Sequence, residues 1–203
     1  MTMKFDFSII KKILFGMASM LISFGSEMTL AKDSMEKIDT VIENNKIIIA
    51  YYSYSGVTKK VAEEICEMVG GYVFEIQTID AYPSDYRSIL KQSEMEIGSG
   101  YKPTLKNSME TLSNYDVIFI GFPVWHGTIA PPVVSFLSAH NLAGKTIIPF
   151  CTHGGGGAGN SFKAVSSLSP DSKILTGGVF LGNPKEEISR WVKSQLDQLA
   201  GKH

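Results

Sequence analysis

Short apolar, β-branched segments alternate with segments of helical periodicity from Lys46 onward, and this alternation constrains the fold more than any other feature of the chain. The apolar segments have the length of strands buried on both faces of a sheet, and they span 46–52, 72–78, 116–122, 146–151 and 173–181. The segments of helical periodicity span 57–69, 84–97, a stretch that begins at Pro131, 160–168 and a last stretch from Lys185. Such alternation implies right-handed crossovers between neighbouring parallel strands. The sequence therefore predicts a doubly wound, three-layer α/β fold with five parallel strands.

One residue in the fourth predicted strand conflicts with a regular sheet. Pro149 lies in the middle of 146–151, where a proline removes one hydrogen-bond donor from the ladder. The segment still has the apolar character of a buried strand. We therefore keep the strand and expect a local irregularity.

The first residues have the layout of an export signal. Lys11 and Lys12 precede an apolar run, Ile13–Phe24, and Thr29–Ala31 then offers the small residues that a signal peptidase reads. The run is shorter than the roughly 20 apolar residues of a transmembrane helix. We predict a signal peptide over 1–31, with an uncleaved N-terminal anchor as the alternative. A polar tether over 32–45 and a domain over 46–203 would follow, and the protein would be exported, as a periplasmic or secreted protein without a stable membrane span once the signal is removed.

Charge and cysteine content exclude several functional classes. Nineteen basic and twenty acidic side chains give a net charge of -1, which leaves no basic surplus for binding nucleic acid. The two cysteines, Cys66 and Cys151, cannot form a disulfide framework, and their surroundings lack the spacing of zinc ligands. We therefore expect no nucleic-acid partner and no metal site.

A hydroxyl-rich loop connects the first predicted strand with the first predicted helix. It reads Ser53-Tyr54-Ser55-Gly56-Val57-Thr58. Free N–H groups at a helix start favour a phosphate, and hydroxyl groups can donate further hydrogen bonds to it. The loop has neither the Walker lysine nor a G-x-G-x-x-G pattern, so it suits a terminal monophosphate better than a pyrophosphate. Ordinary helix capping by Ser53 or Ser55 is the structural alternative.

Two further loops follow buried strands at the same edge of the sheet, where parallel α/β proteins bind their ligands. The segment Pro123-Val124-Trp125-His126-Gly127 places a large aromatic ring where it could stack on a flat ligand. The segment Cys151-Thr152-His153 precedes Gly154–Gly157, whose backbone could approach a ligand closely. Burial of Trp125 against the next helix and a flexible glycine tip are the structural alternatives.

Taken in order, the three loops resemble those of the flavodoxin family. The loop S-x-S-G-x-T matches the phosphate loop [ST]-x-[ST]-G-x-T, GFPVWHGTIAPP is similar to the aromatic flavin loop, and GKTIIPFCTHGGGG is similar to the third flavin loop. The resemblance covers Lys46 to Leu199. It implies a short-chain flavodoxin-like fold with strand order 2-1-3-4-5 and FMN as the cofactor.

The resemblance also implies a role for each loop. The residues that would hold the FMN phosphate are Ser53, Tyr54, Ser55, Gly56, Val57 and Thr58. Those that would line one side of the isoalloxazine are Pro123, Val124, Trp125, His126 and Gly127. Those that would face its pyrimidine edge are Thr152, His153, Gly154, Gly155 and Gly156. His126 and His153 are the candidates for proton donation or substrate binding, and each could equally be a surface histidine bonded to backbone.

Two departures from electron-carrier flavodoxins bear on function. Carriers usually cover the outer flavin face with a tyrosine of the third loop, where this chain has His153 and glycines. Carriers are also often strongly acidic, whereas this chain is nearly neutral. We predict an FMN-dependent oxidoreductase that acts on a small acceptor such as a quinone. A one-electron carrier that serves a partner protein is the alternative.

A hydrolase is the remaining alternative, because His153-Gly154-Gly155-Gly156 also looks like the oxyanion loop of esterases. Such an enzyme needs a G-x-S-x-G elbow around its nucleophile. Gly159-Asn160-Ser161 begins this pattern, but Lys163 stands where the second glycine should be. The hydrolase is therefore disfavoured.

Overall fold

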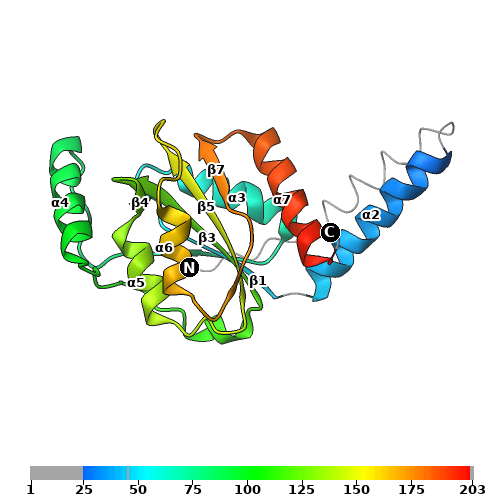
Figure 1. Ribbon diagram of the computed structural model, residues 1–203, viewed down its shortest axis with the longest axis horizontal. Helices are drawn as coiled ribbons and strands as arrows, with labels where there is room; N and C mark the ends of the chain where they lie inside the picture. Colours follow the sequence, from blue (N-terminus) through cyan, green and yellow to red (C-terminus); the bar gives the residue numbers. More distant parts are fainter. Residues whose placement is uncertain (1–24, 45, 202–203) are drawn as a thin grey trace.

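A single sheet with helices on both faces forms the body of the molecule in the computed structural model, which describes residues 25–44 and 46–201 (Figure 1). The strands are β1 Ile47–Tyr51, β2 Tyr72–Glu75, β3 Val117–Trp125, β4 Thr128–Ile129, β5 Thr146–His153, β6 Lys173–Ile174 and β7 Gly178–Leu181. The main path of the sheet runs β2-β1-β3-β5-β6, while β4 pairs with β3 and β7 pairs with β5. Every pairing along the main path is parallel. The predicted α/β class and strand order are confirmed, with β5 as the fourth strand and β6 and β7 together as the fifth.

The helices are α2 Gly25–Asn44, α3 Val57–Val69, α4 Tyr86–Ser99, α5 Pro131–Ala139, α6 Ser161–Leu168 and α7 Lys185–Leu199, with a 3₁₀ helix over Glu110–Asn114. Two layers of helices enclose the sheet. Helices α3 and α7 pack together on one face, and α5 and α6 pack together on the other (Figure 1). Helix α4 stands apart from the sheet at the end of the molecule opposite α2 (Figure 1).

The two cores explain why the strands read as unbroken apolar runs. Along β1, Ile48 and Ala50 belong to the core beneath α5 and α6, whereas Ile47, Ile49 and Tyr51 belong to the core beneath α3 and α7. Successive side chains of a strand point to opposite faces, so a strand covered on both sides needs apolar residues at every position.

The irregularity expected at Pro149 lies in the neighbouring strand. β5 keeps an uninterrupted parallel register with β3, and Pro149 lies opposite Ile120. On the other side of β5, the neighbouring strand is interrupted: β6 ends at Ile174 and β7 begins at Gly178. The three residues 175–177 between them lie opposite only two residues of β5, Ile148 and Pro149. The N–H of Leu175 donates to the carbonyl of Ile147, so the backbone polar groups of Ile147 point toward β6 and β7. Those of every second residue, including Pro149, point the same way. The backbone nitrogen of Pro149 therefore points into this gap, where the ladder has no carbonyl that needs a hydrogen bond from it.

The structure differs from the tether predicted over 32–45. Residues 32–44 belong to α2, which also contains Ala31, the predicted cleavage position. The side chains of Ile38, Val41 and Ile42 recur three and four residues apart and pack on the core beneath α3 and α7. This short apolar stripe stabilises a helix in a segment whose composition is otherwise polar.

The positively charged and apolar parts of the predicted signal, residues 1–24, lie outside the described residues. Within residues 25–44 and 46–201, no helix has the length and hydropathy that a bilayer crossing requires.

Candidate functional site

The structure brings the three predicted loops together at the carboxyl edge of the sheet. The hydroxyl of Thr58 in the first loop lies 2.8 Å from that of Thr152 in the third. The rings of Tyr54 and Trp125 join the first loop to the second, with centroids 5.9 Å apart. The backbone N–H of Asn160 donates to the carbonyl of Gly127 over 2.7 Å, which joins the second loop to the segment after the glycine run. Three segments distant in sequence thus form one site.

The first loop combines helix capping with free donors. The hydroxyl of Ser53 accepts a hydrogen bond from the N–H of Lys59, so the capping alternative holds for Ser53. Gly56 has a φ of 83°, which turns the chain into α3. By helix geometry the N–H groups of Val57 and Thr58 have no intrahelical acceptor. Ser55 is exposed beside them, and a Cβ added at Gly56 would meet nothing within 4 Å. The turn at Ser55 and Gly56 therefore borders open space that a ligand can enter.

The pair of threonine hydroxyls supplies a further donor. Both Thr58 and Thr152 are buried, and a single hydrogen bond connects their hydroxyl oxygens. Each hydroxyl carries one proton, and their mutual bond uses only one of the two. The accepting threonine therefore keeps a proton for another acceptor.

The second predicted loop is largely strand. Pro123, Val124 and Trp125 are the last residues of β3, and they continue into an antiparallel pairing with β4 in which Trp125 lies opposite Thr128. Only His126 and Gly127 form the turn, with φ values of 47° and 73°. Positive φ at both central residues is the geometry of a type I′ hairpin. The hairpin was missed because its short second strand, Thr128–Ile129, has no sequence signal of its own.

Trp125 lies within a cluster of tyrosine rings. Its ring meets those of Tyr52, Tyr54 and Tyr82 edge-on, with centroids 5.7, 5.9 and 5.0 Å away. The indole is half-buried, so part of its surface stays available to a ligand. Tyr52 and Tyr82 were not among the predicted site residues. The signal that could have identified them is an aromatic residue at the carboxyl end of β1 and another shortly after β2.

Burial keeps the cluster uncharged. It raises the pKa of Tyr52, and nearby Tyr54 and Glu96 add to this effect. Burial also raises the pKa of Tyr82, whose hydroxyl donates to the carboxylate of Glu96 over 2.6 Å. Both phenols therefore remain protonated at neutral pH and act as hydrogen-bonding groups.

The two candidate histidines have different surroundings. Nε2 of His126 lies 3.2 Å from the carbonyl of Leu90 and 3.0 Å from the hydroxyl of Ser93, both on α4. A carbonyl only accepts, so Nε2 carries a proton and the ring ties the hairpin to α4. Nδ1 of His153 accepts the N–H of Gly155 over 2.9 Å, which places its proton on Nε2. The contacts of His126 support its structural alternative, whereas Nε2 of His153 remains available.

The third predicted loop begins later than expected. Thr152 and His153 are the last residues of β5, and the loop starts at Gly154. The three exposed glycines Gly154, Gly155 and Gly156 border open space, since a Cβ added at any of them would meet nothing within 4 Å. Their backbone can therefore approach a ligand, as the sequence predicts.

The two cysteines belong to the cores. Cys66 and Cys151 are both buried, and burial raises their pKa values to about 11 and about 12 respectively. Neither thiol is a nucleophile at neutral pH. In the part of the chain that the structure describes, no three His, Cys, Asp or Glu side chains gather as metal ligands would.

The family follows from comparison with known sequences. A sequence model described as Flavodoxin matches residues 46–195, which contain the whole sheet, helices α3 to α6 and most of α7. The chain belongs to the flavodoxin family. A search of curated proteins gives no significant match.

Solved structures agree with this flavodoxin-family assignment. A candidate flavoprotein from Bacteroides eggerthii DSM 20697 is 32% identical, matches 74% of this chain and 98% of its own, and superposes with a TM-score of 0.68. A second candidate flavoprotein, from Bacteroides uniformis ATCC 8492, is 31% identical over 73% of this chain and 98% of its own, also with a TM-score of 0.68. A flavoprotein in complex with FMN from Lactobacillus acidophilus NCFM is 24% identical over 72% of this chain and 98% of its own, with a TM-score of 0.60, and shares the fold.

Proposed function

We propose that this chain binds FMN at the carboxyl edge of its sheet and acts as an FMN-dependent oxidoreductase on a small acceptor such as a quinone. Membership of the flavodoxin family supports FMN as the cofactor, as does the FMN complex of the Lactobacillus acidophilus protein. The observation that carries the proposal is the meeting of the three loops, which combines a phosphate cradle, an aromatic cluster and an exposed glycine backbone.

The residues present fit FMN in their donor chemistry. The N–H groups of Val57 and Thr58 and the exposed hydroxyl of Ser55 would hold the phosphate dianion. The half-buried ring of Trp125 would lie along one side of the isoalloxazine, and Gly154–Gly156 would face its polar edge. When bound, FMN supplies the electron transfer, and the protein positions the flavin and limits access to it.

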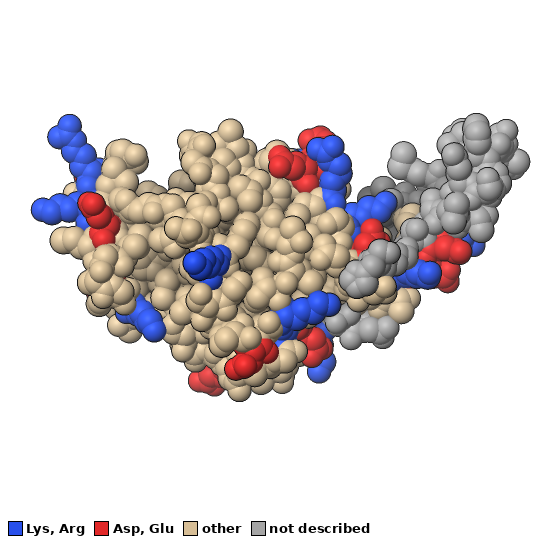
Figure 2. Space-filling model, in the orientation of Figure 1, with Lys and Arg blue, Asp and Glu red and all other residues tan. Residues whose placement is uncertain are grey.

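Direct reaction with a small acceptor is supported by the open third loop. The ring of His153 accepts a hydrogen bond from the N–H of Gly155, which fixes its position. The next three residues, Gly154–Gly156, are exposed and have no side chains that could cover a bound flavin. On the face shown in Figure 2, basic and acidic side chains are interspersed, and neither sign gathers into a patch. This face has no dominant charge, so it offers little electrostatic attraction to a basic redox partner.

Two measurements test the proposal. The cofactor released from the purified full chain is expected to have the mass of FMN, and FAD or the absence of any flavin after reconstitution would contradict FMN binding. Steady-state oxidation of NADH or NADPH with soluble quinones then separates the two activities. Turnover without a second protein supports the oxidoreductase, whereas turnover only on addition of a reductase identifies a carrier.

We also propose that the protein is exported. The proposal rests on Lys11 and Lys12 ahead of the apolar run Ile13–Phe24 and the small residues at Thr29–Ala31. N-terminal sequencing of the protein from its native host is expected to begin at Lys32. A mature protein that retains Met1 in the cytoplasmic fraction would contradict export. If export holds, NAD(P)H is scarce where the protein works, so the turnover assay is repeated with a quinol as the electron donor.

A further inference from the structure

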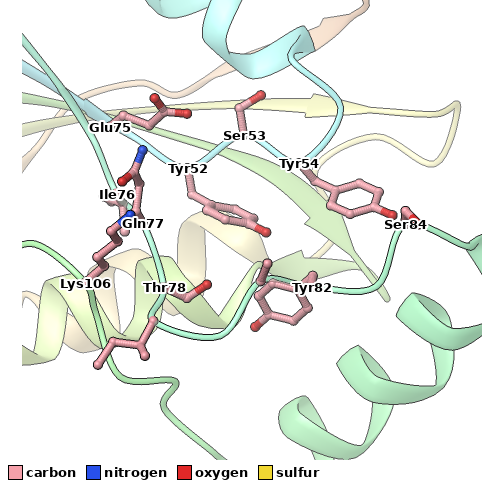
Figure 3. Close-up of a pocket in the computed structure, with 12 residues that line it drawn as sticks. Tyr52, Ser53, Tyr54, Glu75, Ile76, Gln77, Thr78, Tyr82, Ser84 and Lys106 are labelled. Carbon is pink, nitrogen blue, oxygen red and sulfur yellow. The ribbon is translucent and has the colours of Figure 1, made fainter.

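A cavity of about 700 Å³ lies beside the first loop, between the carboxyl ends of β1 and β2 and the segment that leads to α4 (Figure 3). This volume is in the range of small-molecule sites. Ser53 and Tyr54 belong both to the predicted phosphate loop and to the lining of this cavity. None of its lining residues comes from the hairpin at 123–127 or from the glycine run, so the cavity adjoins the proposed FMN site without coinciding with it.

One end of the cavity is aromatic. The rings of Tyr52, Tyr54 and Tyr82 lie around it, and all three also contact Trp125 (Figure 3). The hydroxyl of Tyr54 donates to the carbonyl of Pro83, and that of Tyr82 donates to Glu96. With these donors in use, the two rings mainly offer a flat ligand their apolar surface.

Free donors remain at both ends of the cavity, and Gln77 and Lys106 lie toward the end away from the tyrosines (Figure 3). The hydroxyl of Thr78 is used by the carbonyl of Asp80. Among the lining residues this leaves the hydroxyls of Tyr52, Ser53 and Ser84, the side-chain amide of Gln77 and the ammonium of Lys106, none of which donates a side-chain hydrogen bond within the described residues. The backbone N–H of Lys106 donates to the carbonyl of Gln77 over 2.7 Å, so these two residues are held side by side (Figure 3).

Lys106 supplies the net charge at this end. Glu75 also lines the cavity, but it lies opposite Tyr51 in the sheet register. Tyr51 belongs to the core on the α3 face, so the register places the side chain of Glu75 on that face of the sheet as well. Figure 3 shows its side chain pointing away from Lys106. A ligand that reaches from the tyrosines to Lys106 therefore meets one cation and neutral donors.

We infer that this cavity binds a planar aromatic electron acceptor with a single acidic substituent, its rings against Tyr54 and Tyr82 and its acid group at Lys106 and Gln77. The inference rests on the proposed oxidoreductase function, since it names the acceptor class for the same site. A flat ring matches the aromatic end, and an acceptor-only anion matches the remaining donors. The shared loop at Ser53 and Tyr54 would place such a ring beside the bound cofactor.

Equilibrium dialysis with the FMN-loaded full chain tests the inference. The probes are anthraquinone-2-sulfonate and its neutral analogue 2-(hydroxymethyl)anthraquinone, which share the ring system and differ in charge. Lys106→Met is expected to weaken the sulfonate about two- to fivefold, the effect of an exposed ion pair, and to leave the neutral probe unchanged. Lys102→Met is the matched control, because Lys102 is exposed on the same segment but does not line the cavity. Tyr82→Leu is expected to weaken both probes.

An unchanged preference for the sulfonate in Lys106→Met would overturn the inference. So would displacement of the sulfonate from the FMN-free chain by added FMN, because the cavity would then be part of the cofactor site. If FMN binding itself fails, the dialysis results differ from these. In that case the chain retains no FMN, while dialysis of the FMN-free chain still reports the Lys106-dependent preference.

Discussion

The hydroxyl oxygens of Thr58 and Thr152 lie 2.8 Å apart in the buried floor of the site, where the start of α3 meets the end of β5. The contact connects residues that are 94 positions apart in the chain. It fixes the phosphate loop relative to the third loop. The two threonines are nevertheless not equivalent, because only Thr58 belongs to the proposed phosphate cradle.

This asymmetry predicts different effects of two similar substitutions. Thr58→Val and Thr152→Val each leave one buried hydroxyl without its partner, so both should lower the free energy of unfolding by about 1–3 kcal/mol. If the Thr58 hydroxyl gives the spare proton of the pair to the phosphate, Thr58→Val should also weaken FMN by about 1–2 kcal/mol, whereas Thr152→Val should affect FMN much less. Urea unfolding and fluorescence titration with FMN measure the two quantities. Equal losses of FMN affinity would contradict the assignment of Thr58 to the phosphate.

The two serines of the first loop should separate stability from binding. Ser53 accepts the Lys59 N–H, so Ser53→Ala should lower the free energy of unfolding by about 1 kcal/mol, as loss of a helix cap does. Ser55 is exposed, so Ser55→Ala should leave stability within about 0.5 kcal/mol. It should weaken FMN by about 1–2 kcal/mol through a lost bond to a charged group. An unchanged FMN affinity in Ser55→Ala would place the phosphate elsewhere.

Trp125 should quench the fluorescence of bound flavin. Trp125→Ala is expected to restore flavin fluorescence and to weaken FMN by about 0.5–1.5 kcal/mol beyond the loss of contact area, because an aromatic stacking partner is removed. Trp125→Phe keeps a ring among the three tyrosines and serves as the control for their packing. If fluorescence yield and FMN affinity stay the same in Trp125→Ala, the indole is only a packing residue.

The buried thiol of Cys151 predicts a pH dependence of stability. Burial raises the pKa of this thiol from 9.0 to about 12, so between these values the folded protein keeps a proton that the unfolded chain loses. Stability should therefore be complete below pH 9 and fall as pH rises, by at most about 1.4 kcal/mol per pH unit from this residue. Urea unfolding below and above pH 9 should show a shallower fall in Cys151→Ala. Identical slopes in the two proteins would exclude the thiol as the cause.

Much of this fold was predictable because its signals are local. The apolar runs at β1, β3 and β5 reflect burial on both faces, and the loop around Gly56 carries the turn and helix start in its own residues. These features depend on neighbours in sequence.

The missed features depend on distant partners. β3 extends through Trp125 because β4 pairs with it, and the ring of His126 is directed by Leu90 and Ser93 on another helix. Tyr82 contacts Trp125 although the two are far apart in sequence. The stripe of Ile38, Val41 and Ile42 is too short to stand out from its polar surroundings until α7 and α3 lie beneath it. Such contacts arise only after the chain has folded.

The gap beside Pro149 also affects how the molecule meets its neighbours in concentrated solution. A sheet edge with a long row of unpaired backbone groups can recruit a strand from another chain and start aggregation. Here the outer edge is divided into β6, with two residues, and β7, with four. A foreign strand would find no continuous row of donors and acceptors on either piece. The interruption that accommodates one proline therefore protects this edge of the sheet against pairing with another chain.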